Sequence, residues 1–244
     1  MRIHRNLSLL LLLLAVPLRA QDNGNTDILI GISPGMAMRW QQGTMHTTDG
    51  FYDCCAFTGG SGIGIAGEAR VLFRLGGPVS LRVGAGWERV SSDYQSERKS
   101  YPILGQGNTV EYVDLKNDLG VTMSAAQFNA GIQYLVLEPG LYFTAGVGVT
   151  VPLSPTWKQT EEITGPPGVR YADGSFRKTL FDVDIPGTRP FPTLRFGGGA
   201  MIPIAGDLRL APELLFSLPL METQPDFRWS MSGLDLSVAL MVGL

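Results

Sequence analysis

Apolar residues recur at every second position in eight separate stretches of this chain, and this alternation constrains the fold more than any other feature. Successive side chains of a β-strand point to opposite faces, whereas an amphipathic helix needs apolar residues three and four positions apart. Between Leu141 and Leu153 every odd position is apolar, and the even positions 142–150 are Tyr, Thr or Gly. The same pattern predicts eight strands, over residues 28–40, 63–74, 79–88, 127–136, 141–153, 193–204, 208–218 and 234–244.

The chemistry of the two faces favours a membrane over water as the surroundings of these strands. The apolar face is seven residues deep in the 141–153 strand, and about 9–11 strand residues span a bilayer. The opposite face is rich in glycine and carries arginine and glutamate. Only 17% of the residues are charged, against about 25% in soluble domains. A soluble sandwich or lipocalin-like barrel remains the alternative, because it would show the same alternation.

Short and long connections alternate strictly between the predicted strands. Three links are tight turns: Gly76-Gly77-Pro78, Glu138-Pro139-Gly140 and Ala205-Gly206-Asp207. Four links are long and polar, over residues 41–60, 91–118, 154–191 and 221–232. This order predicts an all-β fold, a transmembrane up-and-down antiparallel β-barrel with short periplasmic turns and long extracellular loops.

One segment does not fit this simple division into strands and loops. Within residues 109–124 most apolar side chains fall on odd-numbered positions. Near Ala125-Ala126 this parity slips, and the apolar side chains that follow fall on even-numbered positions. A β-bulge, or a hairpin arm that continues the strand above the membrane, would explain the slip.

Residues 1–20 have the composition of a secretory signal peptide. Arg2 and Arg5 precede an apolar run over residues 7–16, which is too short to span a bilayer as a helix. We expect cleavage after Ala20, so that residues 21–244 form the barrel domain. An exported barrel of this kind belongs in the bacterial outer membrane.

Charged and aromatic residues occupy positions that suit such a barrel. All four tryptophans lie at or just beyond strand ends on the long-loop side, where an interfacial aromatic girdle is expected: Trp40, Trp87, Trp157 and Trp229. Nine charged residues fall on the polar face, where they can pair within a narrow lumen: Glu68, Arg70, Arg74, Arg82, Glu88, Arg195, Arg209, Glu213 and Asp235.

The whole pattern resembles the small eight-stranded outer-membrane barrels, the OmpA/OmpX-like β-barrel superfamily. The resemblance extends from Thr26 to Leu244. The last strand, residues 236–244, resembles the C-terminal signal by which such proteins engage the barrel-assembly machinery, although it ends in Leu244 where an aromatic residue is common.

Chemically reactive residues are few. His46, in the first long loop, is the only histidine beyond the signal peptide, which excludes a multi-histidine zinc site, and no metal-ligand spacing appears. Gly62 to Gly67 match G-x-G-x-x-G, but no strand–turn–helix surrounds them, so we expect no nucleotide and no other cofactor. We expect no catalytic residue. Cys54 and Cys55 are adjacent and would form a strained vicinal disulfide in an oxidising compartment, or pair with other chains.

Two classes of function fit these observations. The first is a structural or interaction barrel that presents its loops for envelope integrity, adhesion or binding of an extracellular or envelope protein. The second is a narrow pore for small solutes, and a lipid-modifying enzyme is a third, weaker alternative. Outer-membrane lipids are expected neighbours. The net charge of −3 gives no basic surface for nucleic acid.

Overall fold

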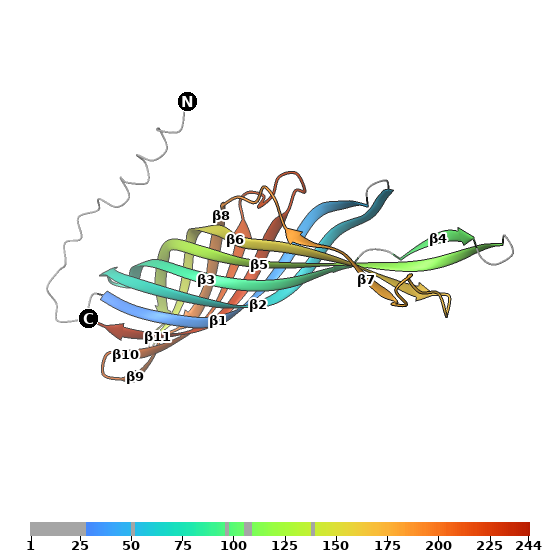
Figure 1. Ribbon diagram of the computed structural model, residues 1–244. Helices are drawn as coiled ribbons and strands as arrows, with labels where there is room; N and C mark the ends of the chain where they lie inside the picture. The colour runs from blue at the N-terminus through green and yellow to red at the C-terminus, as the bar shows by residue number, and fades with distance from the viewer. Residues whose placement is uncertain (1–27, 50–51, 96–97, 105–108, 138–139) are drawn as a thin grey trace, which may run out of the picture.

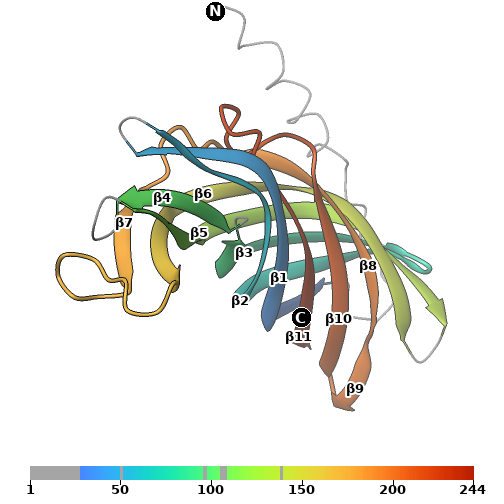
Figure 2. The ribbon, with the colours of Figure 1, turned by 90° about the vertical axis from the view of Figure 1, so that its right-hand side faces the viewer.

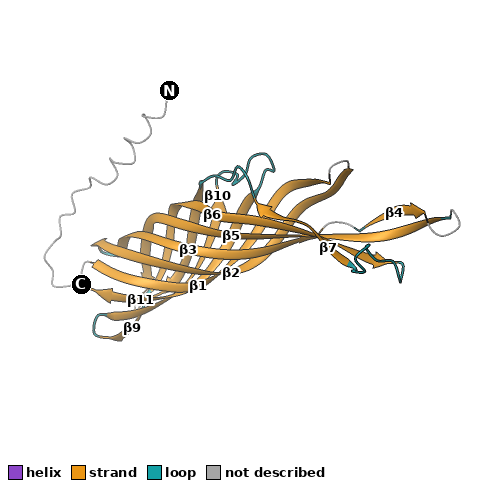
Figure 3. Cartoon of the chain, viewed as in Figure 1, coloured by secondary structure: helices purple, strands orange, loops and turns teal. Residues whose placement is uncertain are grey.

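All regular structure in the described residues is β-strand (Figure 3). The computed structural model describes residues 28–49, 52–95, 98–104, 109–137 and 140–244, so the predicted signal peptide lies outside the described residues. No helix within the described part of the chain is long and apolar enough to cross a membrane. The strands are β1 (Ile28–Asp49), β2 (Tyr52–Gly76), β3 (Val79–Gln95), β4 (Lys99–Leu104), β5 (Val110–Leu137), β6 (Leu141–Gly165), β7 (Arg177–Asp184), β8 (Phe191–Ala200), β9 (Ile202–Ala205), β10 (Leu208–Pro219) and β11 (Ser230–Gly243).

Eight strands close into a barrel (Figures 1 and 2). They follow the order β5-β3-β2-β1-β11-β10-β8-β6, and the ring closes because β6 also pairs with β5. Every pairing is antiparallel, and chain neighbours lie side by side except where β4, β7 and β9 intervene. The predicted eight-stranded up-and-down barrel is therefore confirmed.

The lower part of the barrel, toward the short turns, carries its apolar face outward. In β6, Phe143 and Val147 are 65% and 57% exposed, whereas Tyr142 and Thr144, on either side of Phe143, are buried. The same outward belt recurs on the other ring strands, with Ile32, Met36, Ile63, Ile65, Val83, Phe128, Ile132, Leu194, Leu214, Leu236 and Val238 exposed. A closed barrel with such a belt is the architecture of a bacterial outer-membrane protein. The protein spans the outer membrane.

Near Trp40 and Trp87 the polarity of the two faces exchanges. Outward positions of β5 above this level are polar or glycine, from Lys116 to Ser124. The inward positions are buried and, apart from Asn117, apolar: Val113, Leu119, Val121, Met123 and Ala125. The inward positions of β5 remain odd-numbered below this level, at Gln127 and Asn129, so the parity does not slip. The outside changes from lipid to water, and the interior changes from polar to apolar.

The bulge that would have explained the slip lies in the neighbouring strand. Ser124 pairs with Ser154 and Ala125 pairs with Pro152, which leaves Leu153 of β6 as the extra residue. The alternative of a strand that continues above the membrane is correct for β5, which runs for 28 residues.

Three of the four predicted loops are largely hairpins of β-strand. Residues 41–60, 91–118 and 154–191 contain the upper parts of β1 and β2, all of β4 and β7, and the ends of β3, β5 and β6. The long connections are present as predicted, but their β-structure was not predicted, because the alternation continues with its faces exchanged and so lacks the apolar outer face that marks a membrane strand. β4, β7 and the upper parts of β5 and β6, which we call the arm of β4 to β7, project well beyond the barrel (Figure 1). By its long connections this end is extracellular.

Candidate functional site

Eight charges of alternating sign, six of them buried and two (Glu68 and Arg195) partly buried, form one chain across the middle of the lumen. Its order is Glu88, Arg39, Asp235, Arg195, Glu68, Arg82, Glu213 and Arg70. The contacts after the Arg39–Glu88 pair measure 2.6, 3.2, 3.4, 2.7, 2.6 and 3.0 Å. Four arginines balance four carboxylates, so the chain has no net charge. We call this set, with Asn129 and Tyr142, the lumen network; all eight ring strands contribute to it.

Glu213 is the most heavily bonded carboxylate of the lumen network. Its two oxygens accept two hydrogen bonds from Arg70 at 3.0 Å, one from Arg82 at 2.6 Å and one from the hydroxyl of Tyr142 at 2.9 Å. Its side chain is fully buried. Burial of an ion is costly unless its partners satisfy it, and this set of donors does so.

Glycines on the inner face leave room for the long arginine side chains. A Cβ at Gly84 would lie 2.9 Å from the Asn129 amide oxygen and 3.0 Å from Glu68 Oε1. A Cβ at Gly233 would collide with the Arg39 guanidinium. The high glycine content of the inner face is therefore a packing requirement of the lumen network.

The space left in the lumen is small. Three cavities border the network, with volumes of about 10, 20 and 20 Å³, each large enough for about one water molecule. Interiors of eight-stranded barrels are just wide enough for side chains to fill them. The network therefore closes the middle of the barrel.

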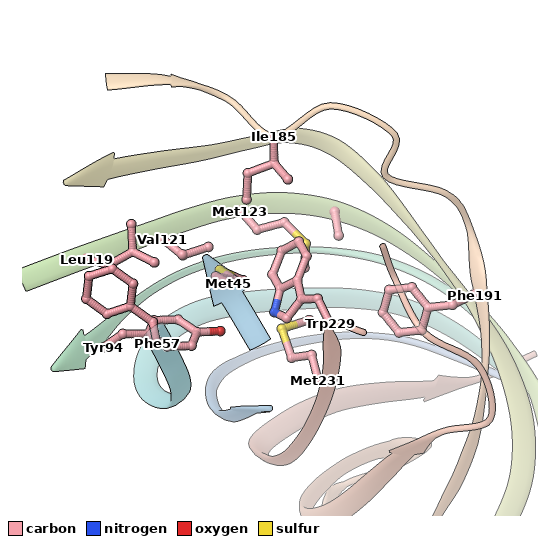
Figure 4. Packing of buried hydrophobic residues seen from close by; sticks show 11 residues of the cluster. Met45, Phe57, Tyr94, Leu119, Val121, Met123, Ile185, Phe191, Trp229 and Met231 are labelled. Atoms are coloured by element: carbon pink, nitrogen blue, oxygen red, sulfur yellow. The ribbon is translucent and has the colours of Figure 1, made fainter. Parts of the chain in front are cut away.

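An apolar cluster closes the lumen above the network (Figure 4). Phe57, Tyr94, Leu119 and Trp229 are completely buried, and Figure 4 shows their side chains turned inward from several strands. The full set, which we call the upper cluster, is Met45, Phe57, Tyr94, Leu119, Val121, Met123, Ala125, Ile185, Phe191, Trp229 and Met231.

Gln41 joins the upper cluster to the polar residues below. Its carbonyl oxygen accepts hydrogen bonds from the hydroxyl of Tyr94 at 2.6 Å and from the indole of Trp229 at 3.2 Å. Its amide donates to Ser92 at 2.7 Å. Burial raises the pKa of Tyr94 above its usual range. The phenol therefore stays protonated and continues to donate.

A second apolar cluster closes the lumen at the short-turn end. It consists of Leu29, Leu72, Tyr142, Met201, Ala211, Ala239 and Met241, with Leu135 packed against them. The lumen is thus filled at three levels.

The structure brings seven of the nine predicted lumen charges into the network. Arg74 and Arg209 lie nearer the turn end, where Arg209 donates to the sulfur of Met201 at 3.6 Å and Arg74 is only partly buried. Sequence reasoning missed Arg39, Asn129 and Tyr142 as members of the network. The inward parity of Arg39 was visible in the sequence, but its two partners, Glu88 and Asp235, depend on strand order.

The four tryptophans do not form one girdle, and this prediction was wrong for Trp157 and Trp229. Trp40 and Trp87 are about 40% exposed and face outward at the top of the apolar belt. Trp229 is completely buried in the upper cluster, and Trp157 packs against it, 5.2 Å from Phe227 between ring centroids. Above the membrane level the inward positions are the apolar ones, so tryptophans placed there belong to the core.

The side chains of His46, Cys54 and Cys55 lie outside the described residues. In the backbone, Thr47 pairs with Cys55 and Thr48 with Asp53, so Cys54 is the extra residue of a bulge near the tip of the β1–β2 hairpin. Among the described residues, no group of three or more potential ligands could hold a metal ion.

Comparisons with known proteins are consistent with a barrel but are too distant to carry an argument about function. No family model and no curated protein matches this chain. Among solved structures, the chain is similar to Neisserial surface protein A, with 9% identity, a TM-score of 0.39, and coverage of 91% of this chain and 100% of that one. It is also similar to Ail of Yersinia pestis, with 11% identity, a TM-score of 0.32 and coverage of 87% and 97%.

A third similar structure is the outer membrane protease OmpT from Escherichia coli, with 8% identity, a TM-score of 0.38 and coverage of 93% and 99%. The chain's own strand ring and lipid-facing belt establish its fold. That fold is the small eight-stranded outer-membrane barrel which the OmpA/OmpX-like resemblance implies.

Proposed function

We propose that this protein is a closed, non-conducting and non-enzymatic outer-membrane barrel whose role is carried by its extracellular part. The observation that supports this most directly is the filling of the lumen by the upper cluster, the lumen network and the turn-end cluster. The largest of the three cavities beside the network is about 20 Å³. A solute pore needs a continuous water-filled path, and these layers interrupt it twice with apolar side chains.

The arm of β4 to β7 is the part that we assign to interaction with an extracellular or envelope protein. Its strands extend beyond the barrel, so they are not needed to cross the membrane. Near its tip Tyr112 is 63% and Val110 is 60% exposed, and aromatic residues of this kind anchor protein interfaces. Adhesion or envelope integrity are the functions that such a surface would serve.

Conductance in planar bilayers tests the closed lumen. We expect no single-channel steps from the full-length wild-type protein, and none from a variant with a single apolar replacement, Trp229→Ala, because the network below still closes the barrel. Stable steps from wild type that Arg82→Ala or Glu88→Ala alters would support the pore instead.

Cleavage of the signal peptide after Ala20 is supported by the basic start and apolar run of residues 1–20. Insertion by the barrel-assembly machinery is supported by the position of the last strand, β11, which pairs with β1 to help close the ring. A vicinal disulfide of Cys54 and Cys55 is supported by their adjacency alone, and mass spectrometry of the unreduced protein tests it.

A further inference from the structure

A polar groove lies on the outward face of the sheet above the lipid-facing belt, where the barrel continues into the arm. It has a volume of about 500 Å³ and is lined by Asp93, Asp118, Gly120, Lys158, Thr160, Arg177 and Thr179, from β3, β5, β6 and β7. The cavities in the lumen are smaller by more than an order of magnitude. The groove is thus the one place among these four cavities with room for a ligand.

The position of the groove indicates what surrounds it. On β3 the outward side chains of the belt end at Trp87, and Arg89, Ser91 and Asp93 follow on the same face. On β5 the outward positions change from Phe128, which pairs with Ala85, to Gly120 of the groove, which pairs with Asp93 eight residues further along. Asp93 lies six residues beyond Trp87, which is roughly 20 Å along the strand. The groove therefore faces the space above the hydrocarbon, into which a large saccharide headgroup of an outer-leaflet lipid extends.

The lining presents both donors and acceptors. Lys158 pairs with Asp182 at 3.4 Å, and Arg177 donates to Thr160 at 3.1 Å. Asp118 Oδ2 accepts from Lys116 at 3.0 Å, whereas Asp118 Oδ1 is buried and has no hydrogen-bond partner among the described residues. Two carboxylates, two cations and two threonine hydroxyls suit a ligand that carries many hydroxyl groups.

Other ligand classes fit this lining less well. A bare phosphate would be repelled by Asp93 and Asp118, which offset the charges of Lys158 and Arg177. A protein partner needs an apolar or aromatic anchor, and no residue that lines the groove provides one.

The floor of the groove is made by a glycine. A Cβ at Gly120 would have only Asp93 Oδ1 at 3.8 Å and the Lys158 carbonyl oxygen at 3.9 Å nearby, so the position is open. A larger side chain there would fill the groove without changing its charge.

We propose that this groove binds the saccharide headgroup of a glycolipid in the outer leaflet, which continues the lipid contact of the belt into the headgroup layer. The inference goes beyond the closed-barrel proposal. Glycolipid binding and conductance are separate measurements, so one proposal can fail while the other holds.

The test uses the full-length protein in nanodiscs of phosphatidylethanolamine and phosphatidylglycerol that contain a minor fraction of rough-type lipopolysaccharide. Native mass spectrometry counts the retained lipids, and dilution into lipid-free detergent gives the dissociation rate. We expect wild type to retain lipopolysaccharide in preference to the phospholipids, and Gly120→Leu to release it about tenfold faster. Gln42→Leu, at an exposed outward position of β1 outside the groove, is the matched control and should behave as wild type.

Lys158→Gln and Asp93→Asn keep the experiment decisive if Gly120→Leu does not fold, because both residues are exposed. A shift in gel mobility on heating identifies folded variants. The proposal would be overturned if wild type retained lipopolysaccharide no better than it retains phospholipid. Equal release rates from wild type and all three folded groove variants would also overturn it. Binding of the free core oligosaccharide in detergent, without retention of the intact glycolipid, would reject a membrane lipid as the ligand.

Discussion

At the scale of single residues, the stability of the barrel interior depends on paired charges. Glu213 pairs with two arginines, Arg70 and Arg82, and each of them would remain buried with one carboxylate partner fewer if Glu213 were lost. Loss of one partner from a buried ion pair costs about 3–5 kcal/mol, because an uncompensated charge remains. The lumen network is therefore a constraint on folding as well as a barrier in the lumen.

We expect Glu213→Ala to lower the free energy of unfolding by about 3–5 kcal/mol. Urea titrations of the protein in bicelles, followed by tryptophan fluorescence, measure this change. Glu111→Ala removes an exposed carboxylate of β5 and should have an effect near zero. Equal effects of the two substitutions would contradict the assignment of Glu213 to a buried network.

Tyr94 makes the stability of the upper cluster sensitive to high pH. Burial raises the pKa of its phenol in the folded state, so its contribution to stability is complete below the unfolded pKa of about 10 and is lost as the pH rises above it. We expect the tyrosinate absorbance of wild type and Tyr94→Phe to coincide at about pH 10 to 11 while the barrel is folded. The absorbance of the two proteins should differ by the signal of one tyrosinate only after the barrel unfolds. Ionisation of Tyr94 in the folded protein at about pH 10 would show that the cluster admits water.

At the scale of elements, each long strand is divided by the surface of the membrane. β6 faces lipid with Val147 and faces water with Thr156 and Lys158, and its backbone adjusts at Leu153 between them. The register of the strand pairs is continuous across this level except at such bulges. The position of the membrane is thus encoded by which face of a strand is apolar.

This division predicts opposite outcomes for one substitution at two positions of β6. Val147→Arg should cost about 2–4 kcal/mol near the midplane and reduce assembly, because it places a charge in hydrocarbon. Thr156→Arg, on the outward face above the bulge, should cost less than about 1 kcal/mol. Val147→Leu is the conservative control. Unfolding titrations and the folded fraction in outer-membrane preparations measure both effects, and similar costs at the two positions would refute the assigned boundary.

At the scale of the whole molecule, side chains fill the lumen, and the long hairpins and the short turns lie at opposite ends of the barrel. The hairpins and the segment 166–176 lie at the extracellular end, and the turns at Gly76-Gly77 and Gly206-Asp207 lie at the other. Arg170 and Arg177 are exposed in or beside that segment.

We expect trypsin added to intact cells to cleave at Arg170 or Arg177, as identified by mass spectrometry of the released peptides. Arg74, beside the periplasmic turn, should be cut only after the outer membrane is permeabilised. Cleavage in the reverse order would invert the assigned orientation.

The sequence alone determined the local features of this protein. Strand periodicity, the inward or outward direction of each membrane residue and the tight turns at Gly76-Gly77 and Gly206-Asp207 follow from neighbouring residues, so they were predictable from residues such as Val147 and Gly77. Direction is a local property of a β-strand because side chains alternate whatever the strand pairs with.

Only the tertiary structure decided which of these residues meet. Glu213 and Arg70 are 143 positions apart, and their pairing depends on the closed order of the ring. Trp229 and the inward residues of β5 belong to a core rather than to an interface, because the environment outside the barrel changes at the membrane surface. That change of environment depends on height along the barrel axis. Height is set by the register of eight strands together and by no single stretch of sequence.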